Sequence, residues 1–235
     1  MSSDGVAAVD RALAILDVFT ERDRSLTLTE ISKRTGYYKS TTLRLAESLE
    51  KFNYLRRADD GSYRLGHKPL LLGALYQTHF RTGDHVPRIL KNLVDQWNEG
   101  ASFFINEGDK RVCLHRVDAQ RAIRDSIREG DSLALGIGAS GHVLLAFSGE
   151  AGEKYDQVRK QMFAASFGER DPETAAYSVP VFGPNQKLVG AISLSGPKYR
   201  FESLDKEAVI QSLFACAAEL SEVFGGRAAW FPKKD

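Results

Sequence analysis

Three helical segments in close succession constrain the fold of this chain more than any other feature of its sequence. Apolar residues recur at helical spacing over Val6–Arg22, which predicts a first helix. Thr27 and Glu30 have the spacing of a capping box, in which the threonine hydroxyl accepts from a backbone N–H and the glutamate reaches back to the threonine N–H. A second helix is therefore expected directly after Thr27, over Leu28–Thr35.

Gly36 is expected to end the second helix, because glycine adopts the left-handed backbone conformation without a steric penalty. A third periodic stretch follows over Lys39–Phe52, and Asn53 is suited to end it in the same conformation. Two short strands are predicted around an Asp-Gly turn, at Tyr54–Arg57 and Tyr63–Leu65. Three helices followed by a hairpin predict a winged helix-turn-helix.

The charge of this segment differs from that of the rest of the chain. The formal net charge is only +1, but residues 32–68 carry nine basic and four acidic side chains, a balance of +5. Residues 1–31 have a balance of −3 and residues 69–235 a balance of −1. Charge alone leaves a solvated surface and a nucleic-acid-binding surface equally open. The helix-turn-wing pattern in the same segment favours nucleic-acid binding.

Several side chains of this segment have the chemistry that binds DNA. Hydroxyl groups and free N–H groups in the first turn of a helix favour phosphate. The fork of Arg44 can read guanine in the major groove, and basic side chains on the wing would neutralise phosphates. Tyr37 and Tyr38 could contact the sugar-phosphate or equally pack as a hydrophobic staple. The predicted DNA-binding residues are Thr29, Lys39, Ser40, Thr41, Thr42, Arg44, Arg56, Arg57 and Arg64.

A family resemblance rests on three segments, VDRALAILDVF, LTLTEISKRTGYYKSTTLRLAESLEKFNYL and DDGSYRLGHKPLLLG. They resemble the IclR (isocitrate lyase regulator) family of bacterial transcription factors, and the resemblance spans nearly the whole chain. We therefore expect a winged helix-turn-helix over residues 1–67, a linker over 68–82, a GAF/PAS-like effector domain over 83–228 and a tail over 229–235. The linker helix, predicted over Pro69–Arg81, is more apolar than one buried face requires. Packing against a partner subunit and packing within the chain are equally open.

The remaining two thirds of the chain alternate between helical and strand periodicity. Helices are expected over Asp84–Glu99, Ala139–Phe147 and Ser203–Phe224. Strands are expected in a hairpin of Ser102–Asn106 and Val112–Val117, in Ala122–Arg128, and in a hairpin of Tyr177–Phe182 and Leu188–Ser195. Antiparallel strands with helices before and after them predict an α+β domain.

This region resembles the family's effector domain at GIGASGHVLLAF, SFGERDPETAAYSVPVFGP and LVGAISLSGPKYRF. The resemblance implies an effector pocket lined by Ala139, Ser140, Ser166, Ala176, Ser193 and Ser195. The last two serines are two positions apart on one predicted strand, so both side chains point to the same face. Two hydroxyls beside a helix N-terminus suit a small carboxylate or carbonyl ligand.

Three departures from the family pattern leave the class of ligand open. The family's usual acidic residue near the pocket is Ser166 here, and its usual cysteine is Ala176. The chain between Phe147 and the Ser166 region is shorter than the family pattern, so a helix is expected to be shortened or lost there.

Other chemistry has little support in the sequence. No GxSxG, Walker A or dinucleotide motif is present, and no further ligand accompanies Cys113 and His115, so no nucleophile, metal site or cofactor is expected. Cys113 is expected to pack in a strand, His115 and His142 to lie at the surface, and Cys216 in the core. Two cysteines fit a reducing cytoplasm, and we predict neither a signal peptide nor a membrane span.

These predictions favour a cytoplasmic, ligand-responsive DNA-binding regulator that is not an enzyme. As a homodimer or dimer of dimers it would bind a pseudo-palindromic operator on double-stranded DNA. Its effector would be a small, carboxylate-bearing metabolite, and RNA polymerase is a further expected partner. Repression and activation are both open. The alternative is a GAF-like small-molecule sensor or enzyme without DNA function, which would require a nucleophile or metal site that the sequence does not show.

Overall fold

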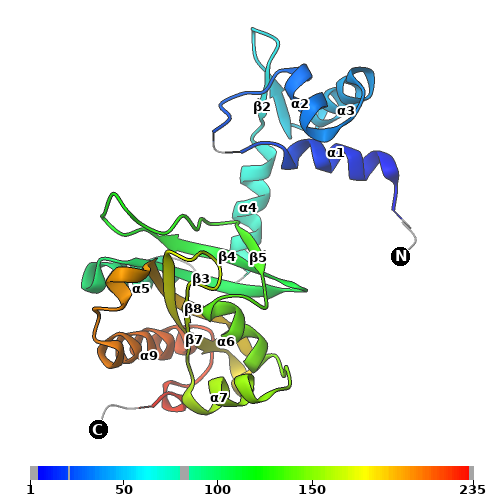
Figure 1. Ribbon diagram of the computed structural model, residues 1–235. Coiled ribbons are helices and arrows are strands. Elements are labelled where there is room, and N and C mark those ends of the chain that lie inside the picture. Colours follow the sequence, from blue (N-terminus) through cyan, green and yellow to red (C-terminus); the bar gives the residue numbers. More distant parts are fainter. Residues whose placement is uncertain (1–4, 21, 80–84, 233–235) are drawn as a thin grey trace. The chain divides into compact units, whose positions relative to one another are not determined.

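The computed structural model describes residues 5–20, 22–79 and 85–232. The chain forms two compact units, Met1–Phe80 and Arg81–Asp235 (Figure 1). This division confirms the predicted two-domain organisation. The end of the predicted linker, residues 80–82, lies outside the described residues.

The first unit contains three helices, a two-stranded wing and a further helix. Its elements are α1 (Ala7–Asp17), α2 (Leu28–Thr35), α3 (Lys39–Lys51), β1 (Leu55–Arg57), β2 (Tyr63–Leu65) and α4 (Lys68–His79). The predicted winged helix-turn-helix is thus confirmed. The first helix ends before Arg22, because a polar turn follows in which the Thr20 N–H donates to the Asp23 carboxylate at 2.9 Å.

The predicted helix boundaries have the expected local causes. Glu30 N donates to the Thr27 hydroxyl at 3.3 Å, and Thr27 N donates to the Glu30 carboxylate at 2.7 Å, so the capping box is complete. Gly36 ends α2 in the left-handed conformation, with φ of 75°. Asn53 follows α3 with φ of 62°. These caps satisfy backbone groups that the helices leave unpaired.

Apolar side chains from all three helices and the wing form the core of the first unit. Leu26 joins the wing as an isolated bridge, because its N–H and carbonyl both pair with Tyr63. Val9 and Leu13, part of the predicted apolar stripe of the first helix, are instead about half exposed. The buried core residues are Ile15, Leu26, Ile31, Ala46, Leu49, Leu55 and Tyr63.

The second unit is an α+β domain built on one antiparallel sheet with the strand order β5-β4-β3-β8-β7-β6. Its strands are β3 (Gly100–Glu107), β4 (Lys110–Val117), β5 (Ser132–Ala134), β6 (Ala164–Phe167), β7 (Thr174–Phe182) and β8 (Leu188–Pro197). Its helices are α5 (His85–Trp97), α6 (Ala139–Phe147), α7 (Glu153–Gln161), α8 (Lys198–Phe201) and α9 (Lys206–Val223). Short 3₁₀ turns cover Pro184–Gln186 and Ala228–Trp230.

Helices cover both faces of this sheet (Figure 1). The long helices α5 and α9 pack together on one face, and α6 and α7 lie on the other. Phe103 and Phe104 show the alternation of the strand, because Phe103 stacks on Phe224 while Phe104 joins the cluster beneath α6. The first turn of α6 is thereby placed over the sheet, where a ligand cavity can form.

One predicted strand of this unit was wrong, and one strand was missed. Ala122–Arg128 is not a strand but an irregular segment, because β5 pairs with the outer edge of β4 and the buried side chains of Asp125 and Ile127 face a cavity. The strand β6 was missed, because its four residues lack β-branched side chains. The helix that was expected to be shortened or lost after Phe147 is present as the nine-residue α7.

Candidate functional site

The N-terminal turn of α3 presents a polar, uncapped surface. No side chain caps this end of the helix and its first turn carries no acid, so the first N–H groups are open to an anion. Lys39, Ser40 and Arg44 are exposed on this helix, and Thr41 is partly exposed. The exposed Thr29 lies in the first turn of α2.

One predicted DNA contact is corrected by the structure. Thr42 is fully buried, and its hydroxyl donates to the Tyr38 carbonyl at 3.1 Å. Its role is therefore to pack α3 into the domain, and it cannot reach a nucleic acid. Tyr38 itself is 85% exposed, which leaves its ring available for the sugar-phosphate backbone.

The wing concentrates arginine on two short strands. Arg56 and Arg64 are direct cross-strand partners, and both are exposed. The Arg57 guanidinium lies 5.7 Å from the centre of the Tyr63 ring, which orients it along the wing. Like charges that face each other across a hairpin destabilise it, so this surface is suited to a polyanion.

A groove between α1 and α3 adds a basic residue that was not predicted. Arg11 lines this groove with Arg44, Ser40 and Thr41. Arg11 lies outside the basic block of residues 32–68, so charge counting along the sequence did not reveal it. By contrast, Arg34 is held by Asp23 through two nitrogen–oxygen contacts of 2.6 and 2.8 Å and serves the fold.

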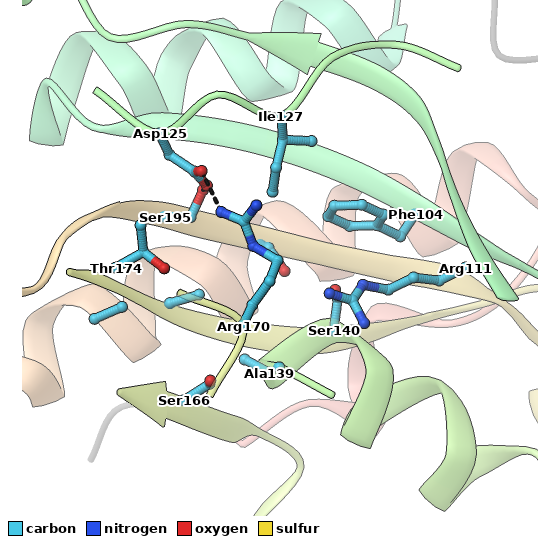
Figure 2. A pocket seen from close by; sticks show the side chains of 14 residues that line it. Phe104, Arg111, Asp125, Ile127, Ala139, Ser140, Ser166, Arg170, Thr174 and Ser195 are labelled. Atoms are coloured by element: carbon cyan, nitrogen blue, oxygen red, sulfur yellow. Dashed lines mark hydrogen bonds and ion pairs between the residues drawn. The ribbon is translucent and has the colours of Figure 1, made fainter. Parts of the chain in front are cut away.

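All six residues predicted for the effector pocket line one cavity in the second unit (Figure 2). The register explains three of them, because Ser166 of β6 faces Ala176 of β7, which in turn faces Ser195 of β8. Ser193 lies two positions from Ser195 on the same face, and the first turn of α6 adds Ala139 and Ser140. The cavity encloses about 30 Å3 of open space.

Charged side chains in the same cavity were missed by the sequence analysis. Asp125 is 4% exposed, and one of its oxygens pairs with Arg170. Its other oxygen accepts from the Ser195 hydroxyl at 2.8 Å. The Arg170 side chain therefore reaches into the cavity between the two walls (Figure 2). The additional lining residues are Phe104, Arg111, Asp125, Ile127, Gly138, Arg170, Thr174 and Ala175.

Arg111 enters the cavity from β4. Its side chain is almost fully buried, and Nη1 donates to the carbonyls of Ala134, at 2.5 Å, and Ile137. Its guanidinium lies 5.5 Å from the centre of the Phe104 ring. Burial lowers the pKa of Arg111 to about 10, so the group still carries its charge at neutral pH. No ion pair to Arg111 is found among the described residues.

The two serines of β8 have different surroundings. The Ser195 hydroxyl accepts from Arg116 Nη1 at 3.0 Å while it donates to Asp125. The Ser193 hydroxyl is 2% exposed and has no hydrogen-bond partner within the described part of the chain. A buried hydroxyl without a partner is costly, so Ser193 is the group that a bound ligand would satisfy.

Both histidines predicted at the surface are buried. His142 Nε2 lies 2.6 Å from the Glu169 carboxylate and 2.9 Å from Lys154 Nζ. Glu169 also accepts from Gly138 N at 3.0 Å; although burial opposes ionisation, these hydrogen bonds lower the pKa of Glu169. His115 is 6% exposed, and burial lowers its pKa. Each imidazole is buried against a glutamate from another segment, Glu169 for His142 and Glu129 for His115, which the local sequence does not reveal.

The two cysteines differ in burial. Cys113 is fully buried in β4, which confirms strand packing, whereas Cys216 is only partly buried. Within the described ranges, no three histidine, cysteine or acidic side chains are grouped to hold a metal ion. No described helix combines the length and hydrophobicity needed to cross a bilayer.

A winged helix-turn-helix with an open basic surface, joined to an α+β unit, defines the class of DNA-binding transcriptional regulators. Comparison with known proteins gives the family. The model of the IclR helix-turn-helix domain matches residues 8–59, and the model of the bacterial transcriptional regulator IclR C-terminal domain matches residues 152–222. The chain belongs to the IclR family of transcriptional regulators.

Individual relatives cover almost the whole chain. The HTH-type transcriptional regulator XynR of Escherichia coli is 26% identical over 94% of this chain and 98% of its own length. The crystal structure of the Thermotoga maritima IclR is 22% identical, has a TM-score of 0.76, and covers 92% of this chain and 98% of its own. An IclR homologue from Microbacterium hydrocarbonoxydans, solved with 4-hydroxybenzoate, is 17% identical with a TM-score of 0.77, over 93% and 99% of the two chains.

Proposed function

We propose that this protein binds a pseudo-palindromic operator as a homo-oligomer and that a small, carboxylate-bearing metabolite in the cavity of the second unit switches it. The observation that carries the effector assignment is the cross-strand row of Ser166, Ala176 and Ser195 beside the first turn of α6. Hydroxyls and helix N–H groups at one cavity recognise carboxylates. The family relative solved with 4-hydroxybenzoate binds such a group.

The operator would be read by α3 and held by the wing. Arg44 would contact base edges, and the N–H groups and hydroxyls of Ser40 and Thr41 would bind phosphate together with Lys39 and Thr29. The wing arginines Arg56, Arg57 and Arg64 would contact the backbone or minor groove.

Oligomerisation is supported by apolar side chains that remain in solvent. Val6, Val9 and Leu13 on or beside α1 are more than half exposed. On α4, Leu70 is 77% exposed, with Leu71 and Leu72 beside it. Several large apolar side chains exposed on the same helix indicate a protein interface. Two copies of the winged unit would match the two half-sites of a pseudo-palindrome.

The effector would act by favouring one arrangement of the DNA-binding domains. Because the coupling between two sites is reciprocal, operator DNA must change the effector's affinity by the same factor as the effector changes the affinity for DNA. The protein would work in the cytoplasm on genes transcribed by RNA polymerase. We assign it no enzymatic turnover.

Footprinting on the DNA upstream of neighbouring genes, repeated with candidate carboxylates, tests this function. We expect a protected, pseudo-palindromic site whose affinity falls steeply with salt and changes with one of the carboxylates. Retention on random DNA equal to that on every upstream fragment, with no response to any carboxylate, would contradict the proposal. A turnover assay without DNA tests the alternative function.

A further inference from the structure

The charges that line the cavity do not cancel. Among the described residues, the charged lining side chains are Arg111, Arg170 and Asp125, which sum to +1. Asp125 already pairs with Arg170. The sum stays at +1 whichever arginine takes Asp125. Glu169, whose carboxylate accepts from Gly138 N, is balanced by Lys154 across His142, so the cavity lacks one negative charge. A buried charge without a counter-ion is costly, and a ligand that supplies the missing charge removes that cost.

The guanidinium of Arg111 keeps one side open toward the cavity. Nη1 is used by two carbonyls, and Nε is buried without a partner in the described structure. Nη2 faces Gly138, where an added Cβ would lie 3.1 Å from it. Gly141 makes room from the next turn, because a Cβ there would lie 2.8 Å from Nη1. Because neither glycine has a side chain, the Arg111 guanidinium has room to lie beside the start of α6.

The first turn of α6 adds donors at the same place. The helix has nine residues; Glu169 accepts from Gly138 N, and Gly138 itself supplies no side-chain cap to the following N–H groups. The N–H groups of Ala139 and Ser140 have no acceptor within the helix. The buried, unpartnered hydroxyl of Ser193 lines the same cavity. Figure 2 shows the Arg111 guanidinium beside Ser140.

We propose that the effector is a monoanion, a monocarboxylate with a second polar oxygen, and that Arg111 is its charge anchor. This inference rests on the proposed effector function of the cavity and narrows it. The carboxylate lies between Arg111 and the N–H groups of Ala139 and Ser140, and the second oxygen meets the Ser193 hydroxyl. A second negative charge would leave the cavity with a net charge of −1 next to Asp125, so dicarboxylates are rejected.

The small size of the cavity requires a side chain to move before a whole ligand can enter. An open space of about 30 Å3 is enough for only a few water-sized groups. It accepts a carboxylate head group, while the rest of the ligand needs space that Arg170 now fills. Arg170 lies on the irregular segment between β6 and β7. Ligand entry is therefore expected to shift this side chain along the wall while its ion pair with Asp125 is kept, so the charge of the cavity wall stays the same.

Two matched series of compounds test the charge rule on the full-length protein without DNA. Lactate, malate and lactamide form one series; 4-hydroxybenzoate, 4-hydroxyphthalate and 4-hydroxybenzamide form the other. Calorimetric titration should show the monoanion of at least one series binding roughly tenfold or more tightly than its dianion and its amide. Equal binding of a dianion or an amide overturns the proposal. So does the absence of binding by both monoanions up to about 10 mM, beyond the weak end of specific binding.

Variants of the charged residues identify the anchor. Arg111→Met should abolish monoanion binding, and Arg111→Lys should weaken it roughly tenfold because the fork is lost. Arg88→Met on α5 is the matched control, since Arg88 is exposed and pairs with Glu219. Monoanion binding that survives Arg111→Met excludes Arg111 as the anchor.

A second variant covers the case in which Arg111→Met does not fold. Asp125→Asn raises the cavity charge from +1 to +2 and should shift the preference toward the dianion of the same series. An unchanged order of preference overturns the charge rule. The proposed function fails separately, if monoanions bind as expected but leave operator affinity unaltered.

Discussion

Arg56 and Arg64 stand directly opposite each other on the two strands of the wing. Both side chains are exposed, and the turn between the strands carries the acids Asp59 and Asp60, of which Asp60 is bound to Ser62. Facing arginines repel each other in the free protein. A phosphate placed between them would replace that repulsion with two attractive contacts. The loss of repulsion favours binding of the wing to DNA.

Removing one of these arginines should separate stability from DNA binding. We expect Arg56→Ala to stabilise the free wing, by about 0.2–1 kcal/mol, because a like-charge pair is lost. The same change should weaken DNA binding on all sequences and lower the salt slope by about one. Fluorescence anisotropy at several salt concentrations measures the slope, with Arg88→Ala as the control. A salt slope equal to that of the parent protein would remove Arg56 from the interface.

Replacing Arg44 should affect specificity instead. Arg44→Ala is expected to lower operator affinity by about 1–3 kcal/mol if the fork reads a base, and to leave binding to random DNA almost unaltered. Gel-shift titrations on operator and on random DNA provide the comparison. Lys39→Ala serves as the contrast, because loss of a phosphate contact should reduce both affinities together. Equal losses on the two DNAs for Arg44→Ala would contradict base readout.

The two serines of β8 should differ in their contribution to stability. Ser195→Ala breaks hydrogen bonds to Asp125 and Arg116 and leaves buried charged groups unsatisfied, at a cost of about 1–3 kcal/mol. Ser193→Ala removes a hydroxyl without a partner in the described structure and should leave the ligand-free protein as stable as before. Both should reduce the effector response. Thermal melting separates the two variants, and equal destabilisation would show that Ser193 is bonded in the free protein.

The ion pair between Asp23 and Arg34 predicts a pH dependence of the first unit. Hydrogen bonds from Arg34 and Thr20 hold the pKa of Asp23 well below its ordinary value of 3.8. A carboxyl whose pKa is lowered in the folded state stabilises the fold above 3.8, and this contribution is lost as the pH falls further. Asp23→Asn should therefore lower the melting temperature at pH 7. The difference should shrink progressively below pH 3.8, and a difference that is constant with pH would contradict the assignment.

The cysteines should be unreactive in the native protein. Burial raises the pKa of Cys113 to about 12 and that of Cys216 to about 12. Below these values the thiols stay neutral, and the neutral thiol is a poor nucleophile. Labelling with a thiol reagent at pH 8 should be slow and should accelerate as the pH rises, while guanidinium chloride should expose both groups at once. Rapid labelling of two thiols in native buffer would contradict this.

The accuracy of the sequence-based predictions followed the range of the interactions involved. Thr27, Gly36 and Asn53 act on neighbours within a few residues, so the ends of the second and third helices were correctly predicted, whereas the first helix ends at Asp17 and not at Arg22. The α+β class of the second unit was also correct, since its long strands carry their own periodicity. The short β6 was missed because pairing with β7, rather than its own composition, makes it a strand. The alternating residues around Asp125 were wrongly predicted to form a strand, because β5 and not this segment pairs with β4.

The amino-acid sequence alone determined the winged helix-turn-helix, the α+β class, and which small polar residues share a face. It could do so because caps, turns and periodicity are local properties. Only the tertiary structure decided that Thr42 is buried, that His142 meets Glu169, and that Arg111 and Asp125 line one cavity. His142 and Glu169, like Arg111 and Asp125, come from different segments of the second unit, and the fold of that unit brings them together. Burial then gives their charges a weight that exposed charges lack, because water no longer screens them.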